Sequence, residues 1–255
     1  MTFNVAAEAY DQFMGGWSRQ LSAPFADFAG VESGLRVLDV GCGPGILTSE
    51  LVDRLGTDAV AAVDPSEPFV AAVRERYPGV DVRPASAEAL PYPADAFDAA
   101  LAQLVVHFMT DPVAGLREMA RVTRPGGVVA ACVWDHGSSR GPLSVFWRAA
   151  LDLDPNATDE SRLAGARAGH LVELLEAAGV RETMETELTV TRDFGSFDEW
   201  WDPYTQSVGP AGVYVASLGP DRRVELRDRC RTMLPGGSFS LEAVAWTARG
   251  TTPAA

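Results

Sequence analysis

Short apolar runs alternate with amphipathic stretches through the middle of the chain, beginning at Leu35. Each apolar run has the length of a buried strand, and the stretch after it repeats apolar positions at helical spacing. This alternation is typical of βαβ units, which build a mostly parallel sheet with helices on both faces. The predicted strands cover residues 35–40, 59–64, 80–85, 97–106 and 127–134, and the predicted helices between them cover 46–56, 68–77 and 114–123.

The pattern changes after Asp135. A Gly/Ser-rich turn leads to an aromatic helix over residues 142–151, and an acidic linker then precedes a helix over 169–180. Strand-like runs follow at 184–194 and 238–250, and the second is expected to close the sheet in the antiparallel direction. The predicted fold is α/β: a Rossmann-like three-layer sandwich with a mostly parallel seven-stranded sheet, an antiparallel last strand and a helical lid.

Two regions lie outside this alternation, the N-terminal residues and an aromatic stretch late in the chain. Ligands of open α/β sheets bind beyond the carboxyl ends of the strands, so segments added at that edge cover the pocket. We predict an N-terminal helical lid over 1–30 and a main domain over 31–255, with lid insertions around 137–165 and 195–235. Their aromatic side chains suit an apolar or aromatic small-molecule acceptor, or else lid packing or a homodimer interface: Phe146, Trp147, Phe197, Trp200, Trp201, Tyr204 and Tyr214.

A glycine-rich loop with the sequence Asp-Val-Gly-Cys-Gly-Pro-Gly, residues 39–45, follows the first predicted strand and opens a predicted helix. Its glycines allow a tight turn and let the backbone approach a ligand closely. The spacing differs from the dinucleotide pattern G-x-G-x-x-G, because Ile46 stands where the third glycine belongs. Asp64 ends the second strand, where an acid binds ribose hydroxyls and disfavours a phosphorylated ribose. Together these features predict a nucleotide-like ligand.

These motifs resemble those of the class I S-adenosylmethionine-dependent methyltransferases, in particular the UbiE-like small-molecule group. The family motif D/E-x-G-x-G-x-G is matched in full by residues 39–45, and the resemblance covers most of 35–134. It includes Asp64, the segment 86–98 and the Arg-Pro-Gly-Gly turn before the fifth strand. The resemblance implies S-adenosylmethionine as cofactor, S-adenosylhomocysteine as product, and methyl transfer to oxygen, nitrogen or carbon of a small molecule.

The resemblance also implies individual roles. The glycine loop would hold the methionine and ribose parts of the cofactor, Asp64 its ribose hydroxyls, and Ala87 its adenine ring. Many relatives carry Asp where this chain has Ser86, whose hydroxyl can also accept a hydrogen bond. The residues expected at the cofactor are Tyr10, Trp17, Arg19, Asp39, Gly41, Cys42, Gly43, Gly45, Asp64, Pro65, Ser66, Ser86, Ala87, Glu88 and Gln103.

The segment 10–19 resembles the lid entry of small-molecule members of this family. The aromatic faces of Tyr10 and Trp17 suit a sulfonium, and the Arg19 guanidinium suits the methionine carboxylate. The alternative is that both aromatic rings pack against a helix and that Arg19 is solvated.

Two histidines are candidate catalytic residues, His107 after the fourth strand and His136 after the fifth. Methyl transfer is an in-line displacement that depends mainly on positioning, so a base is needed only if the acceptor must lose a proton. His107 is the first candidate, and its structural alternative is packing against Phe108. His136 is the second, because Asp135 would orient it if both side chains entered the pocket.

Composition excludes other classes. The net charge of -14 opposes binding to nucleic acid, which requires basic surfaces. The three cysteines Cys42, Cys132 and Cys230 are isolated, so neither disulfides nor a zinc site is expected. Gln103 ends the fourth strand where a catechol-type metal site would need an acid, so no metal is expected. Without a signal peptide or an apolar run long enough for a membrane span, the chain is predicted to be cytoplasmic. The basic residues are all arginines, which favours a bacterial source.

Three alternative functions are compatible with parts of this pattern. A relative of this fold can use the bound sulfonium to promote a rearrangement or cyclisation without transferring the methyl group. A nicotinamide-dependent oxidoreductase shares the strand, glycine loop and acid but is opposed by the glycine spacing. A non-catalytic binding protein would be expected to lose pocket residues, whereas the loop and the ribose acid are intact.

Overall fold

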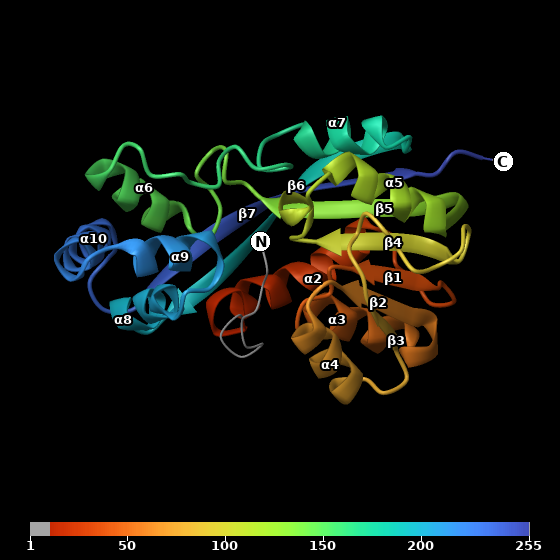
Figure 1. The fold of residues 1–255 in the computed structure, drawn as a ribbon, viewed down its shortest axis with the longest axis horizontal. Helices are drawn as coiled ribbons and strands as arrows, with labels where there is room; N and C mark the ends of the chain where they lie inside the picture. The colour runs from red at the N-terminus through yellow and green to blue at the C-terminus, as the bar shows by residue number, and fades with distance from the viewer. Residues whose placement is uncertain (1–10, 255) are drawn as a thin grey trace.

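The computed structural model describes residues 11–254, which fold around one seven-stranded sheet (Figure 1). The strand order is β3-β2-β1-β4-β5-β7-β6, and β7 is antiparallel to both of its neighbours while β1 to β5 are parallel. The predicted α/β class and the antiparallel last strand are therefore confirmed. The strands are β1 (Val37–Val40), β2 (Val60–Asp64), β3 (Asp81–Pro84), β4 (Phe97–Gln103), β5 (Thr123–Trp134), β6 (Arg181–Phe194) and β7 (Phe239–Thr251).

Helices cover both faces of the sheet, because successive residues of each buried strand point to opposite sides. In β1, for example, Val37 belongs to one hydrophobic cluster and Leu38 to the other. The first cluster joins the sheet to α2 (Gly16–Phe28), α3 (Ile46–Leu55) and α4 (Glu67–Arg76). The second joins it to α5 (Pro112–Val122) and α7 (His170–Ala177). Among the described residues, no helix is long and apolar enough to cross a membrane.

Two strand boundaries next to the site differ from those predicted from the sequence. The fourth strand ends at Gln103, not Val106, because Leu104 adopts a left-handed backbone with a φ of 61° and a 3-10 turn, η3 (Val106–Phe108), follows. The fifth strand begins at Thr123, so the Arg-Pro-Gly-Gly turn is an irregularity within β5, where its register against β4 shifts. The break after Gln103 turns the chain across the edge of the sheet.

The remaining elements gather at one end of the long strands β6 and β7 (Figure 1). They are a π-helical turn η1 (Asp11–Gly15), α6 (Ser144–Leu153), α8 (Phe197–Trp201), a 3-10 helix η4 (Asp202–Gln206), α9 (Gly209–Ser217) and α10 (Pro220–Met233). Contacts between α6 and α10, and between η1 and η4, join segments that are far apart in the sequence. A further 3-10 turn, η2 (Thr57–Ala59), precedes β2.

Candidate active site

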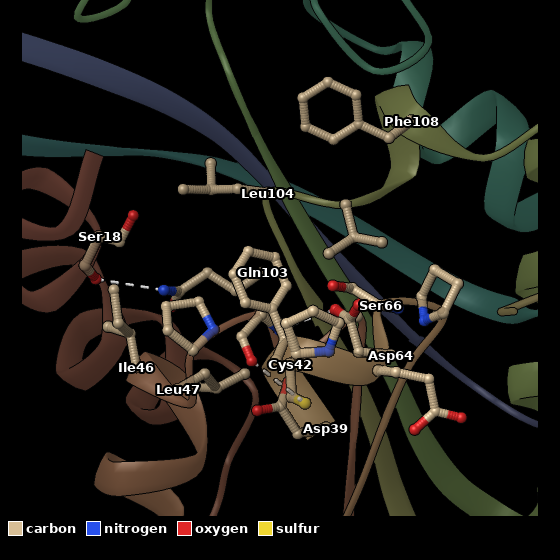
Figure 2. A pocket seen from close by; sticks show the side chains of 18 residues that line it. Ser18, Asp39, Cys42, Ile46, Leu47, Asp64, Ser66, Gln103, Leu104 and Phe108 are labelled. Atoms are coloured by element: carbon tan, nitrogen blue, oxygen red, sulfur yellow. Dashed lines mark hydrogen bonds between the residues drawn. The ribbon is translucent and has the colours of Figure 1, made fainter. Parts of the chain in front are cut away.

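A cavity of about 420 Å³ lies beyond the carboxyl ends of β1, β2 and β4 (Figure 2). Its volume falls within the range of about 300–1,000 Å³ that is usual for small-molecule sites. The wall contains several residues predicted from the sequence: Asp39, Gly41, Cys42, Gly43, Asp64, Pro65, Ser66 and Gln103. The strand ends therefore bring together side chains from three separate stretches of sequence.

The glycine loop runs along one side of the cavity. The backbone N–H groups of Gly41 and Cys42 both donate to the carbonyl oxygen of Val63, at 2.8 and 2.9 Å, which fixes the loop to β2. Gly41 has a φ of +72°, and a Cβ atom there would lie 2.5 Å from a methyl carbon of Val105. Because side chains are excluded, the backbone itself forms this part of the wall. Gly45 lies outside the wall but has a φ of 88° at the N-terminus of α3.

Asp64 is held in place by backbone donors at the end of β2. Its carboxylate accepts hydrogen bonds from the N–H of Gly43 at 2.9 Å and from the N–H of Ser66 at 2.8 Å, one on each oxygen. Burial raises the pKa of Asp64, and both backbone donors lower it. Each carboxylate oxygen can accept a further hydrogen bond, so the oriented carboxylate suits two neighbouring hydroxyls.

Asp39 occupies the other side of the loop and is almost fully buried. The Thr48 hydroxyl donates to its carboxylate at 2.6 Å, which links the end of β1 to α3. Burial raises the pKa of Asp39 to about 7, and the nearby charge of Asp64 contributes to the rise. Asp39 therefore holds the loop in place as well as lining the cavity.

The far end of the cavity presents two polar atoms that lack partners. The side-chain amide of Gln103 donates to the backbone oxygen of Ser18 at 3.2 Å, as the dashed line in Figure 2 shows. The carbonyl oxygen of Gln103 and the hydroxyl of Ser18 are both buried without a hydrogen-bond partner among residues 11–254. Since buried polar groups are normally satisfied, these atoms fit a ligand that supplies hydrogen-bond donors.

Several residues predicted at the cofactor lie outside the wall of this cavity. Trp17 packs in the core, with its ring centroid 6.4 Å from that of Trp134, so its role at a cofactor stays a prediction. Arg19 is exposed, and Tyr10 lies outside the described residues.

The segment predicted at the adenine is also outside the wall. Ser86 is exposed and Ala87 is buried. Glu88 accepts hydrogen bonds from the backbone N–H groups of Thr110 and Asp111, at 2.8 and 3.3 Å, and so holds the turn before α5. The role of this segment at a cofactor stays a prediction.

Sequence reasoning missed a set of wall residues that surround the predicted ones. Most of them follow directly after the glycine loop, after Pro65 or after the end of β4. Their position just beyond a strand end could therefore have identified them from the sequence. Ser18 had no such signal, because α2 approaches the sheet only through tertiary packing. The additional residues are Ser18, Pro44, Ile46, Leu47, Glu67, Pro68, Phe69, Leu104, Val105 and Phe108.

A second, smaller chamber of about 40 Å³ adjoins the cavity and contains both candidate histidines. Leu104 and Phe108 line both spaces and so form the wall between them. The ring centroids of His107 and His136 lie 6.2 Å apart. Phe13 and Met14 from the N-terminal region, with residues 208–210, complete the chamber, which from here on is called the histidine chamber.

Both imidazoles are buried and uncharged at neutral pH. Burial and the neighbouring His136 lower the pKa of His107 to about 3, and burial lowers the pKa of His136 to about 4. Within the described part of the chain, the Nδ1 atom of His107 has no hydrogen-bond partner. The His107 ring also packs against Phe108, with ring centroids 3.9 Å apart. His107 therefore makes the expected contact with Phe108 and also lines the chamber.

The neighbouring acid Asp135 does not orient His136 by a hydrogen bond. Its carboxylate accepts from the backbone N–H of Ser138 at 2.9 Å and from Nε of Arg140 at 2.6 Å. Arg140 also pairs with Glu187 on β6, at 2.7 Å. The carboxylate of Asp135 therefore anchors the loop after β5 to β6.

Comparison with known proteins agrees with the fold. Residues 38–131 match the methyltransferase domain family. The chain is 34% identical over 146 residues to malonyl-[acyl-carrier protein] O-methyltransferase of Erwinia pyrifoliae, covering 57% of this chain and 54% of that one. It is 37% identical over 117 residues to the ubiquinone biosynthesis O-methyltransferase of Rhizobium johnstonii, covering 44% and 46%. The chain spans about half the length of the curated relatives it matches.

Among solved structures, the [4+2]-cyclase SpnF superposes with a TM-score of 0.54 at 25% identity, covering 93% of this chain and 81% of that one. The fold, the glycine loop with Asp64 at the end of β2, and the match of residues 38–131 agree with the predicted resemblance to the class I S-adenosylmethionine-dependent methyltransferases. The comparisons support S-adenosylmethionine as cofactor, and the buried polar atoms of Gln103 and Ser18 fit that ligand, which carries an amino group.

Proposed function

We propose that the chain transfers a methyl group from S-adenosylmethionine to a small, apolar or aromatic acceptor. The observation that carries this proposal is the arrangement of two adjoining spaces. The cavity beside the glycine loop shares the lining residues Leu104 and Phe108 with a chamber that contains two buried, uncharged imidazoles.

The chain's own residues provide binding and orientation on the cofactor side. When bound, S-adenosylmethionine supplies a methyl group already activated on a sulfonium. Asp64 would accept hydrogen bonds from the ribose hydroxyls, and the carbonyl oxygen of Gln103 and hydroxyl of Ser18 would accept from the amino group. The glycine backbone would lie directly against the ligand because no side chain intervenes.

On the acceptor side, the histidine chamber contains two buried imidazoles that can receive a proton. Its apolar lining from Phe13, Leu104, Phe108 and Trp134 favours an uncharged or aromatic body. His107 is proposed as the base for an acceptor that must lose a proton, because its imidazole is unprotonated and its Nδ1 lacks a partner. His136 is the second candidate on the same wall.

The N-terminal region and the two insertions are proposed to act as the lid over this acceptor side. Phe13 from the N-terminal region stacks edge-on against Tyr204, with ring centroids 5.1 Å apart. The amide of Gln206 donates to the amide oxygen of Gln12 at 3.0 Å. These contacts tie the N-terminal region to the late insertion above the histidine chamber.

The test is incubation of the purified protein with S-adenosylmethionine carrying an isotope-labelled methyl group and a panel of aromatic phenols, amines and carbon nucleophiles. Labelled product that depends on Asp64 supports methyl transfer. Calorimetry with S-adenosylhomocysteine on the same preparation reports cofactor binding separately. Absence of any binding would overturn the proposal.

A second candidate function is cyclisation or rearrangement without methyl transfer. It is favoured by the identity of 25% to the [4+2]-cyclase SpnF over 93% of this chain. The same incubation separates the two functions, because this candidate predicts an altered product that contains no label and a cofactor that is recovered unchanged.

A further inference from the structure

Glu160 is a third titratable residue of the histidine chamber and lies in a stretch outside the predicted motifs. Its side chain is only 4% exposed, and Nε1 of Trp147 donates to one carboxylate oxygen at 2.8 Å. Among residues 11–254, no arginine or histidine nitrogen lies within 4 Å of this carboxylate, and the chain contains no lysine. Glu160 is therefore a buried acid whose charge has no partner within the described protein.

Such an arrangement is costly unless something compensates the charge. Removing a carboxylate from water is unfavourable by several kcal/mol when no cation accompanies it. The consequence is visible in the pKa of Glu160, which burial raises to about 7. The indole N–H of Trp147 is one donor to the carboxylate of Glu160, which has the capacity to accept further hydrogen bonds. A cationic ligand would supply the positive charge that the described residues do not place beside Glu160.

The position of Glu160 shows where such a ligand would lie. Glu160 and His136 line the histidine chamber and also an outer cleft of about 150 Å³, so both stand between the chamber and this cleft. The chamber is also lined by His107 and by the aromatic residues Phe108 and Trp134. Aromatic faces attract cations, and uncharged imidazoles do not repel them.

We propose that Glu160 binds the protonated nitrogen of an amine acceptor in the histidine chamber, so that the acceptor is an amine with an apolar or aromatic body. This inference rests on the proposed methyl transfer and narrows its substrate class. The chamber's volume of about 40 Å³ is enough for a small polar head group but not for a whole molecule. The net charge of -14 also favours a cationic ligand over an anionic one.

The proton and charge balance is consistent with this assignment. An ammonium ion must first lose one proton, which passes to solvent, to expose the nitrogen lone pair. The nitrogen–carbon bond then forms as the sulfur–carbon bond breaks, and its electron pair stays on sulfur. The methylated nitrogen again carries one positive charge, which the carboxylate of Glu160 stabilises before release.

The test uses two probes of matched shape, benzylamine and benzyl alcohol, titrated into the full chain saturated with S-adenosylhomocysteine. Calorimetry is expected to show benzylamine binding at least tenfold more tightly than benzyl alcohol. In Glu160→Gln, which keeps an acceptor for Trp147 but removes the charge, this preference is expected to disappear. In the matched control Asp152→Asn, which removes a charge that lines the outer cleft and pairs with Arg229, it should change less than twofold.

Each outcome decides a different point. Equal binding of the two probes to the wild-type chain, binding of neither, or an unchanged preference in Glu160→Gln would overturn the amine assignment. S-adenosylhomocysteine affinity in every variant reports whether the protein is folded. If S-adenosylhomocysteine fails to bind even the wild-type chain, the proposed function fails as well, whereas normal binding without an amine preference refutes only this inference.

Discussion

Replacing Asp64 by alanine tests the ribose assignment. In the described structure its carboxylate accepts two backbone hydrogen bonds, at 2.9 and 2.8 Å, and each oxygen has capacity for one more. A hydrogen bond to a charged group contributes about 1.5–3 kcal/mol, so Asp64→Ala should weaken S-adenosylhomocysteine binding roughly 10- to 150-fold. Calorimetric titration measures this change directly.

Two further variants separate ligand binding from loop stability. Asp64→Asn keeps an oxygen that can accept from Gly43 or Ser66 but loses the charge, so it should retain the fold while still weakening the ligand. Asp81→Asn is the matched control, because Asp81 pairs with Arg83 at the start of β3 and lies outside the cavity wall. Unchanged affinity in both Asp64 variants would refute the reasoning.

The remaining predictions concern the loop and the two histidines. Gly41→Ala should abolish cofactor binding through a clash with Val105, whereas Gly43→Ala, also at positive φ but with open space around it, should weaken it less; equal losses would contradict the steric argument. His107→Ala should lower turnover with S-adenosylhomocysteine affinity unchanged, and undiminished turnover would leave His107 a structural role. Because burial lowers the pKa values of His107 and His136, the unfolded chain binds more protons below pH 6.5, so these groups reduce stability as pH falls toward 4. Urea unfolding at several pH values should show a smaller acid loss in His107→Gln.

The sheet was predictable because its strands are buried on both faces and therefore appear as short apolar runs bounded by turns. The glycine loop and Asp64 were also visible, since a loop that must admit a ligand requires glycines at fixed positions. The break in the strand after Gln103 could not be predicted from the sequence. Leu104 turns the chain there in a left-handed conformation that leucine rarely adopts, and only tertiary packing fixes it.

The histidine chamber shows a second limit of sequence reasoning. His107 and His136 were individually identified by their positions after strands, but their approach depends on the parallel pairing of β4 with β5. Glu160 lies on an irregular segment with no periodicity to mark it, and its burial results from packing beside Trp147. The ion pair between Asp135 and Arg140 could not be predicted either, because it depends on how the loop after β5 folds back.

A crystal structure of the chain with S-adenosylhomocysteine tests the cofactor site most directly. We expect the ribose hydroxyls on the carboxylate of Asp64, the amino group near Gln103 and Ser18, and the sulfur facing Leu104 and Phe108. A ligand bound elsewhere, or one whose ribose lies away from Asp64, would contradict the proposed site.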